Sequence, residues 1–315
     1  MSSIQKMNNT SLWTALITPL NLDGSLNETD LINLIHEQEH AGNGIVILGS
    51  TGEALNLTRL EKERIIELIS ELKLTIPIVV GVGGFDLEST LDWLDYLETK
   101  RVHGYLMVTP MYSKPGAEGQ FHWFKSLMDH VTRPCMLYNV PGRTAIPLNT
   151  DSVRRLANHS NFWAIKESSG SHEIMKKYQD AVGPGKIYCG DDPCLANFVS
   201  CGAVGLVSVA SNVWPREVSA YVELGLEHKL TMADIHLWEK ASLALFKSSN
   251  PVPVKALMAK EGRISSNCVK LPLHSDDYKH LDELIDFSNQ VRLWFENCRY
   301  SGRLKNENEK IETIS

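Results

Sequence analysis

Lys166 is the residue whose position most directly suggests covalent chemistry. It directly follows the apolar run 162–165 (FWAI), so its amine would project from the end of a buried strand rather than into open water. A lysine must lose its proton to attack a carbonyl carbon, and its ordinary pKa is near 10.4, so neutrality at pH 7 costs about 4 to 5 kcal/mol. Burial and a nearby cation, for which Arg143 is the candidate, would lower that cost. A surface lysine at the start of a loop is the alternative interpretation.

Tyr138 and Arg143 occupy one segment, 138–144 (YNVPGRT). A tyrosine at the end of a strand can transfer protons, and an arginine can hold a carboxylate through two parallel hydrogen bonds. A core aromatic residue and a solvated turn cation are the competing interpretations of the same two residues.

Ser50 and Thr51 stand between two glycines in the segment 49–53 (GSTGE). Hydroxyl groups and unobstructed backbone N–H groups at the start of a helix suit a carboxylate or a phosphate. An ordinary turn bounded by glycines would look the same. Tyr112 follows a Thr-Pro turn and would also fit an interface aromatic residue.

Metal chemistry is not expected. Asp191 and Asp192 precede Pro193, and we expect them to cap the helix that this proline opens rather than to bind a metal. The six cysteines form no CxxC pair and have no zinc-finger spacing to histidine, so buried reduced thiols are expected.

The elements that must position these residues repeat along the chain. Apolar, mostly non-alternating runs occur at 12–18, 45–48, 78–82, 104–109, 135–140, 162–166, 186–190 and 205–210. Such runs are typical of strands buried on both faces, and helical 3.6-residue patterns separate them. Their spacing of about 20 to 33 residues predicts an α/β fold, a (β/α)8 TIM barrel, whose chemistry sits where the strands end. An open doubly wound sheet would need a GxGxxG motif after the first strand, where residues 18–21 read TPLN.

The predicted barrel spans residues 10–230. Helical patterns at 232–247, 254–261 and 276–298 predict a small C-terminal helical domain over 231–300. Residues 301–315 are polar and charged, and we expect a flexible tail there.

Composition excludes several function classes. The 315 residues carry a net charge of −7, which disfavours a nucleic-acid or anionic-membrane surface. No apolar stretch is long enough to cross a bilayer, and the first 20 residues lack a cleavable signal. A cytoplasmic protein is expected.

The sequence resembles the dihydrodipicolinate synthase family, within the pyruvate-dependent class I aldolase superfamily. The resemblance covers about residues 10–275 and rests on the segments 49–53 (GSTGE), 109–112 (TPMY), 138–144 (YNVPGRT), 165–167 (IKE), 190–192 (GDD) and 250–255 (NPVPVK). It implies condensation of pyruvate with L-aspartate 4-semialdehyde, without a metal or organic cofactor. It also implies a homo-oligomer, a tetramer of paired dimers.

The resemblance also implies roles for single residues. Lys166 matches the lysine that forms an imine with pyruvate, and Tyr138 matches the proton donor and acceptor. Ser50 stands where the family usually has threonine in a proton relay, and Tyr112 matches the relay member that a neighbouring subunit donates. Thr51 and Val207 match positions that contact pyruvate, Val207 through its backbone. Arg143 matches the residue that orients the semialdehyde.

Two alternatives stay open on the sequence. One is another aldolase of the superfamily, such as N-acetylneuraminate lyase or a 2-oxo-3-deoxy sugar acid aldolase, and Arg143 is the residue that argues against it. The other is a non-catalytic ligand-binding barrel.

The resemblance further implies a regulatory pocket for lysine in some family members. The matching positions here are Ala54, Leu55, Arg59, Lys62, Phe85, Ser89 and Met111. Cations and apolar side chains there should fail to hold a lysine ammonium, so weak or absent inhibition by lysine is expected.

Overall fold

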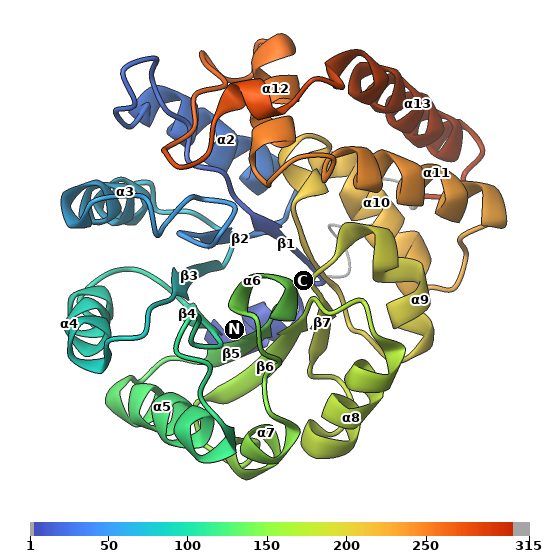
Figure 1. Cartoon of the computed structure of the whole chain (residues 1–315). Helices are drawn as coiled ribbons and strands as arrows, with labels where there is room; N and C mark the ends of the chain where they lie inside the picture. Colours follow the sequence, from blue (N-terminus) through green and yellow to red (C-terminus); the bar gives the residue numbers. More distant parts are fainter. Residues whose placement is uncertain (1–2, 305–315) are drawn as a thin grey trace.

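Eight parallel strands close into a barrel in which each strand pairs with the next along the chain and the last pairs with the first (Figure 1). The computed structural model describes residues 3–304. The strands are β1 (Leu12–Ala15), β2 (Gly44–Ile47), β3 (Ile78–Val82), β4 (Gly104–Val108), β5 (Cys135–Asn139), β6 (Phe162–Glu167), β7 (Ile187–Cys189) and β8 (Leu206–Ser208). Every strand overlaps the run predicted for it, and the TIM-barrel prediction is confirmed.

Helices surround the barrel, and one of them, the short α6 (Pro141–Thr144), lies over the centre of the barrel instead of in the outer ring, as Figure 1 shows. They are α2 (Glu28–His40), α3 (Arg59–Glu71), α4 (Leu87–Glu98), α5 (Ala117–His130), α6 (Pro141–Thr144), α7 (Thr150–Leu156), α8 (His172–Val182), α9 (Leu195–Ser200) and α10 (Pro215–Leu226), with 3-10 turns at η1 (Asp192–Cys194) and η2 (Ala210–Asn212). Local sequence explains several starts: Asn27 accepts from the Asp30 backbone N–H, and Thr58 and Glu61 form a capping box.

An N-terminal helix that the sequence pattern did not predict closes the amino end of the barrel. This helix, α1 (Ser3–Asn8), buries Met7 completely. Its last residue, Asn8, accepts a hydrogen bond of 2.9 Å from the Trp163 indole N–H. At six residues, α1 is too short for its periodicity to stand out, so only the tertiary contact reveals it.

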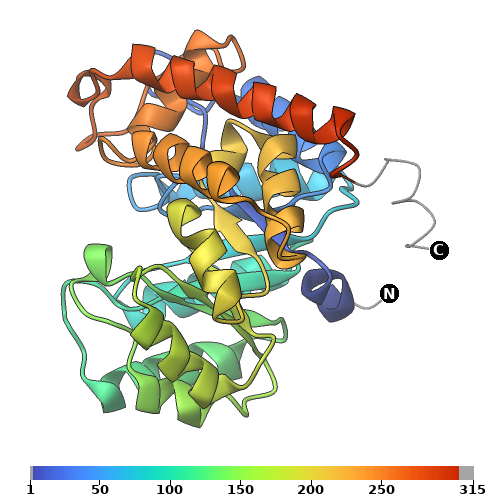
Figure 2. The ribbon, with the colours of Figure 1, turned by 90° about the vertical axis from the view of Figure 1, so that its right-hand side faces the viewer.

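The C-terminal helices are α11 (Met232–Ala244), α12 (Val252–Lys260) and α13 (Leu281–Tyr300), with a 3-10 turn η3 (Ser275–Asp277) between the last two. The pattern at 276–298 had predicted one continuous helix, but residues 278–280 leave the helical conformation and α13 begins only at Leu281. In Figure 2 these helices lie together along one side of the barrel.

A cluster of large aromatic rings joins the C-terminal helices to the barrel. Trp238 of α11 stacks on Tyr221 of α10 at 4.6 Å between ring centres and meets Trp214 and Trp294 edge-on. Rings of this size bury 150–250 Å² each and dominate the energetics of such contacts. The C-terminal segment is therefore packed against the barrel through one shared hydrophobic core.

The first residues of the predicted tail, which the structure describes as far as residue 304, are anchored to the protein. Arg303 pairs with Asp234 of α11 at 2.5 Å and also donates to the Lys229 carbonyl at 3.1 Å. Residue 303 therefore belongs to the folded body, whereas residues 305–315 of the predicted tail lie outside the described residues.

Candidate active site

Lys166 and Tyr138 lie side by side at the carboxyl ends of neighbouring strands. The two residues are paired in the register of β5 and β6, so both side chains point to the same face of the sheet. The Lys166 Nζ atom lies 4.3 Å from the centre of the Tyr138 ring. Only 4% of Lys166 is exposed. The interpretation of Lys166 as a surface lysine is wrong.

Gly190 makes room for the lysine side chain. A Cβ atom at this position would lie 2.8 Å from Lys166 Cε and 2.9 Å from Lys166 Cγ, closer than carbon atoms pack. Gly190 therefore packs directly against the Lys166 side chain, and its backbone N–H donates to the Glu167 carbonyl at 2.7 Å.

A carboxylate adjoins the amine. Burial raises the pKa of Asp191 to about 6, the positive charge of Lys166 opposes that rise, and the negative charge of Asp192 adds to it. The charge of Lys166 acts on Asp192 as well. The acidic pair thus supplies negative charge beside the amine, whereas the sequence had suggested a cation there.

The prediction that Asp191 and Asp192 cap the helix opened by Pro193 is wrong. The Asp191 side chain makes no capping hydrogen bond to the turn η1. Asp192 is buried and accepts hydrogen bonds from the Ser208 hydroxyl and from the backbone N–H of Val209 at 2.9 Å. Asp192 therefore ties the end of β7 to the end of β8, because its carboxylate satisfies polar groups that follow Val207.

A second contact holds β5 and β6 in register behind the lysine. Glu167 is completely buried, and its carboxylate accepts from the Asn139 amide at 2.6 Å and from the Ser169 backbone N–H at 2.7 Å. Burial raises the pKa of Glu167, and these hydrogen bonds oppose the rise. Since Asn139 and Glu167 are the register neighbours of Tyr138 and Lys166, this contact fixes the pair beside it.

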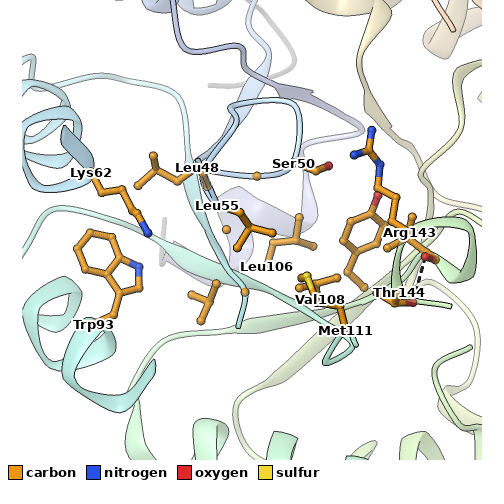
Figure 3. Close-up of a pocket in the computed structure, with 17 residues that line it drawn as sticks. Leu48, Ser50, Leu55, Lys62, Trp93, Leu106, Val108, Met111, Arg143 and Thr144 are labelled. Atoms are coloured by element: carbon orange, nitrogen blue, oxygen red, sulfur yellow. Dashed lines mark hydrogen bonds between the residues drawn. The ribbon is translucent and has the colours of Figure 1, made fainter. Parts of the chain in front are cut away.

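A cavity of about 320 Å³ opens at the same end of the barrel. Figure 3 shows Ser50, Arg143, Thr144 and Met111 around one part of it, and Lys62 and Trp93 at the other end. Tyr138 lines it too. The structure therefore brings together three of the predicted residues, a hydroxyl, a phenol and a guanidinium, on one apolar cavity large enough for a small oxoacid.

The other predicted site residues do not line this cavity. Thr51 and Val207 are buried, and neither they nor Lys166 lines the cavity. Tyr112 is 88% exposed and has a left-handed backbone φ of 66°, a conformation that costs energy for a bulky residue. Tyr112 does not line the cavity of its own chain.

A second cavity adjoins the first. It measures about 470 Å³ and includes four of the positions predicted for a lysine pocket, Arg59, Lys62, Phe85 and Ser89. The other three, Ala54, Leu55 and Met111, line the first cavity instead. Two acidic residues that were not predicted from the sequence, Asp86 and Asp92, also line this cavity.

Asn250 is a site residue that sequence reasoning did not assign. Its amide N–H donates to Thr51 Oγ at 2.8 Å, and its backbone carbonyl accepts from Arg143 Nη2 at 3.4 Å. The two contacts reach across 199 and 107 residues, so no spacing rule could have found them. The only sequence signal for Asn250 is the segment 250–255 (NPVPVK), which carries part of the family resemblance but indicates no role for this residue.

The described part of the chain has neither a candidate metal site nor a candidate membrane-spanning helix. Between residues 3 and 304 the structure has no group of three or more His, Cys, Asp or Glu side chains arranged to hold a metal ion. No helix in that range is long and apolar enough to span a membrane.

Nearly the whole chain is similar to known proteins of one family. Residues 8–290 match the model of the dihydrodipicolinate synthetase family. A 4-hydroxy-tetrahydrodipicolinate synthase of Francisella philomiragia is 42% identical over 287 residues, 91% of this chain and 97% of the relative.

Solved structures of proteins with the same family name have a similar fold. The 4-hydroxy-tetrahydrodipicolinate synthase of Methylacidiphilum fumariolicum SolV superposes with a TM-score of 0.83 at 31% identity, covering 91% of this chain and 98% of the other. A chloride-inhibited dihydrodipicolinate synthase from Acinetobacter baumannii, solved in complex with pyruvate, gives a TM-score of 0.83 at 29% identity and covers 90% and 98% of the two chains.

Proposed function

This chain belongs to the dihydrodipicolinate synthetase family, and from that premise we propose that Lys166 is the nucleophile of its reaction. The chain is a lyase of the 4-hydroxy-tetrahydrodipicolinate synthase type, which condenses pyruvate with L-aspartate 4-semialdehyde. The observation that supports Lys166 is its placement: an amine 4% exposed, at the carboxyl end of a barrel strand, 4.3 Å from the Tyr138 ring.

The first half of the reaction forms an imine. The neutral Lys166 amine attacks C2 of pyruvate, a C–N bond forms, and the carbonyl oxygen takes up protons and leaves as water. Tyr138 donates and accepts the protons of these steps, with the Ser50 hydroxyl as the next group of a relay. The ionised carboxylate of Asp191 favours the positive charge that the protonated imine carries.

The second half forms the new carbon–carbon bond. Loss of a methyl proton converts the imine to an enamine, because the imine nitrogen accepts the electron pair that an organic cofactor would otherwise take. The enamine carbon attacks the aldehyde carbon of the semialdehyde, whose oxygen is protonated. The semialdehyde amine then displaces the Lys166 amine from the imine carbon, which closes the ring and frees the enzyme.

Carboxylate groups orient both substrates in this proposal. Thr51 and the backbone at Val207 hold the pyruvate carboxylate, while the Arg143 guanidinium holds the carboxylate of the semialdehyde. Arg143 lines the cavity of about 320 Å³ together with apolar side chains, an environment that strengthens a bidentate ion pair. It is also the residue that favours the semialdehyde over uncharged sugar aldehydes.

A second copy of the chain completes the site. Tyr112 is 88% exposed, and Leu55 and Phe85 on the neighbouring loops are 61% and 63% exposed. Exposed apolar side chains gathered near one edge of the active site are typical of an interface. We propose that this face pairs two subunits, that Tyr112 reaches the Ser50 hydroxyl of the neighbour, and that two such dimers form a tetramer. We place the enzyme in the cytoplasm, where all six cysteines, which are free in the structure, would stay reduced.

Borohydride reduction in the presence of pyruvate tests the nucleophile. The reduced enzyme should gain the mass of one pyruvate adduct per chain, and peptide mapping should place it on Lys166. Lys255 is a matched control, since it is equally buried but holds Glu53 in an ion pair of 2.5 Å and should carry no adduct. The variant Lys166→Met should show neither adduct nor synthase activity, and full activity in this variant would refute the proposal.

A further inference from the structure

The segment 250–255 lies against the loop that carries the site hydroxyls. Asn250 immediately precedes the proline that opens α12. Its side chain reaches Thr51, and both residues are buried, with 5% and 3% of their surfaces exposed. A residue of the C-terminal segment therefore contacts a residue of the β2–α3 loop, although neither lines the cavity.

A second contact anchors the same loop. The Lys255 ammonium pairs with the Glu53 carboxylate at 2.5 Å, and that carboxylate also accepts from the Lys270 backbone N–H at 2.6 Å. Leu48 at the start of the loop and Glu53 in its middle have left-handed backbone φ angles of 54° and 56°. Non-glycine residues adopt such angles at a cost that the surrounding structure must offset, and the contacts of Lys255 and Lys270 with Glu53 stabilise this conformation.

The direction of the Asn250–Thr51 hydrogen bond determines what Thr51 can do. A hydroxyl group has one proton to donate and lone pairs that accept. Because Asn250 donates to Thr51 Oγ at 2.8 Å, that oxygen acts as an acceptor and its proton remains available. Among residues 3–304, Thr51 Oγ makes no other hydrogen bond, and the Asn250 Oδ1 atom is buried without a partner.

We propose that Asn250 is a positioning residue for pyruvate: its amide N–H holds Thr51 Oγ as an acceptor, so that the Thr51 O–H donates to the pyruvate carboxylate. The C-terminal segment thus takes part in substrate binding, in addition to packing on the barrel. This inference rests on the proposed role of Thr51. Asn250 acts on pyruvate through its side chain, whereas Arg143 contacts its backbone carbonyl, so a side-chain substitution separates the two substrates.

Steady-state kinetics of Asn250→Ala test the proposal. We expect the half-saturating pyruvate concentration to rise about 10-fold, the fold-change typical of losing one hydrogen bond to a charged group. The semialdehyde KM should change by less than about 2-fold, since the Arg143 contact is to the backbone. The pyruvate dependence of borohydride trapping should shift in parallel. Asn250→Ser, whose side chain is too short to reach Thr51, gives the same measurement if the alanine variant does not fold.

Three further variants separate a positioning role of Asn250 from a general contribution to the stability of the fold. Asn250→Asp keeps the size of the side chain but can only accept from Thr51, so pyruvate binding should be no better than in Asn250→Ala. In a Thr51→Val background, Asn250→Ala should have less than about a 2-fold further effect, because the group it acts through is gone. Asn43→Ala is the matched control, a buried asparagine that bonds Gln38 and the Pro215 carbonyl, and it should lower Tm without changing the pyruvate KM.

Three results would overturn the inference: an unchanged pyruvate KM in folded Asn250→Ala, recovery of pyruvate binding in Asn250→Asp, or equal effects of Asn250→Ala with and without Thr51. Failure of the wild-type enzyme to trap pyruvate would instead refute the proposed role of Lys166, so the two failures are distinguishable.

Discussion

The Lys166 amine lies over the face of the Tyr138 ring, 4.3 Å from its centre, and the two residues are direct partners in the register of β5 and β6. The face of this aromatic ring therefore packs against the proposed nucleophile, and its hydroxyl is the proposed proton donor. Substitutions at Tyr138 can therefore test the contribution of the ring contact and that of the hydroxyl separately.

Tyr138→Phe should keep the packing and remove the proton transfer. The phenyl ring preserves the contact with the lysine, so the variant should still form a pyruvate adduct on prolonged incubation with borohydride. The loss of a general acid–base group lowers rates by about 10²- to 10⁴-fold, and kcat should fall by that factor. Tyr138→Leu, which also removes the ring, should lower the yield of the adduct. Wild-type kcat in Tyr138→Phe would contradict the assigned role.

Arg143→Ala should damage use of the semialdehyde far more than use of pyruvate. The guanidinium is proposed to bind a carboxylate inside an apolar cavity, where losing one partner of a charged pair costs about 2 to 5 kcal/mol. The kcat/KM for the semialdehyde should therefore fall about 30-fold or more, while the extent of pyruvate trapping stays the same. Arg143→Lys keeps the charge but loses the bidentate geometry, and should recover only part of the loss. Equal losses for both substrates would contradict this assignment.

Mixing two inactive variants tests whether Tyr112 acts in the neighbouring subunit. Tyr112→Phe and Lys166→Met should each be nearly inactive. If Tyr112 crosses a two-fold interface, a mixed dimer has one site with an intact lysine and a tyrosine from the partner. After subunit exchange at equal concentrations, about a quarter of wild-type activity should return, by random pairing across a two-fold interface. A mixture that stays inactive after exchange, verified by native mass spectrometry, would place Tyr112 in its own site.

Asp191 makes stability fall as the pH rises from about 4 to 6. Its pKa is about 6 in the folded protein and near 3.9 in an unfolded chain. Below about pH 4 the Asp191 carboxyl is protonated in both the folded and the unfolded protein, so it does not affect stability. Above about pH 6 the carboxyl is ionised in both states, and the folded protein bears the cost of burying that charge. The ionised group therefore lowers the free energy of unfolding by about 3 kcal/mol at most.

Asp191→Asn should remove that dependence. In urea titrations between pH 4 and 7, the stability difference between the variant and the wild type should grow as the pH rises through this window. Because the charge of Asp191 also raises the pKa of Glu167 and interacts with Asp192, the variant relieves these neighbours as well, and the whole pH-dependent difference reports the charge at position 191. Parallel curves for the two proteins would contradict the raised pKa.

Lysine should inhibit this enzyme weakly or not at all. Arg59 and Lys62 line the cavity of about 470 Å³, and Lys62 also lines the active-site cavity. Arg59 is fixed over the Trp93 ring at 4.5 Å and bonded to Glu63 at 2.6 Å, so its charge stays in place and repels an ammonium. Asp86 and Asp92 in the same wall oppose this repulsion, and Asp86 is occupied in capping α4 through Ser89.

A coupled assay with added lysine measures this effect. Less than about 2-fold inhibition at about 1 mM lysine is expected, which corresponds to a Kd in the millimolar range or weaker. Lys62→Gln removes one of the two cations and should increase the sensitivity. Inhibition at micromolar lysine in the wild type would show that the two aspartates dominate the cavity.

Much of the fold and of the site could be predicted from the chain. The strand runs are continuous and apolar because both faces of a parallel barrel strand are buried, and their repeat indicates the barrel without reference to any tertiary contact. Lys166, at the end of such a run, was therefore a candidate nucleophile from its position alone. The capping box of Thr58 and Glu61 likewise depends only on residues close together in the sequence, and the structure contains it.

Tertiary structure alone decided the electrostatic surroundings and the long-range contacts. Asp191 and Asp192 were predicted to cap a helix, because an aspartate before a proline is often a helix cap. That prediction was wrong. When the barrel closes, the end of β8 brings the Ser208 hydroxyl and the Val209 N–H to Asp192, which accepts hydrogen bonds from both. Asn250 reaches Thr51 across 199 residues, and no periodicity or spacing carries such information. Local sequence determines which face of each element is apolar, whereas the closure of the barrel determines which polar groups meet and which hydrogen bonds they can make.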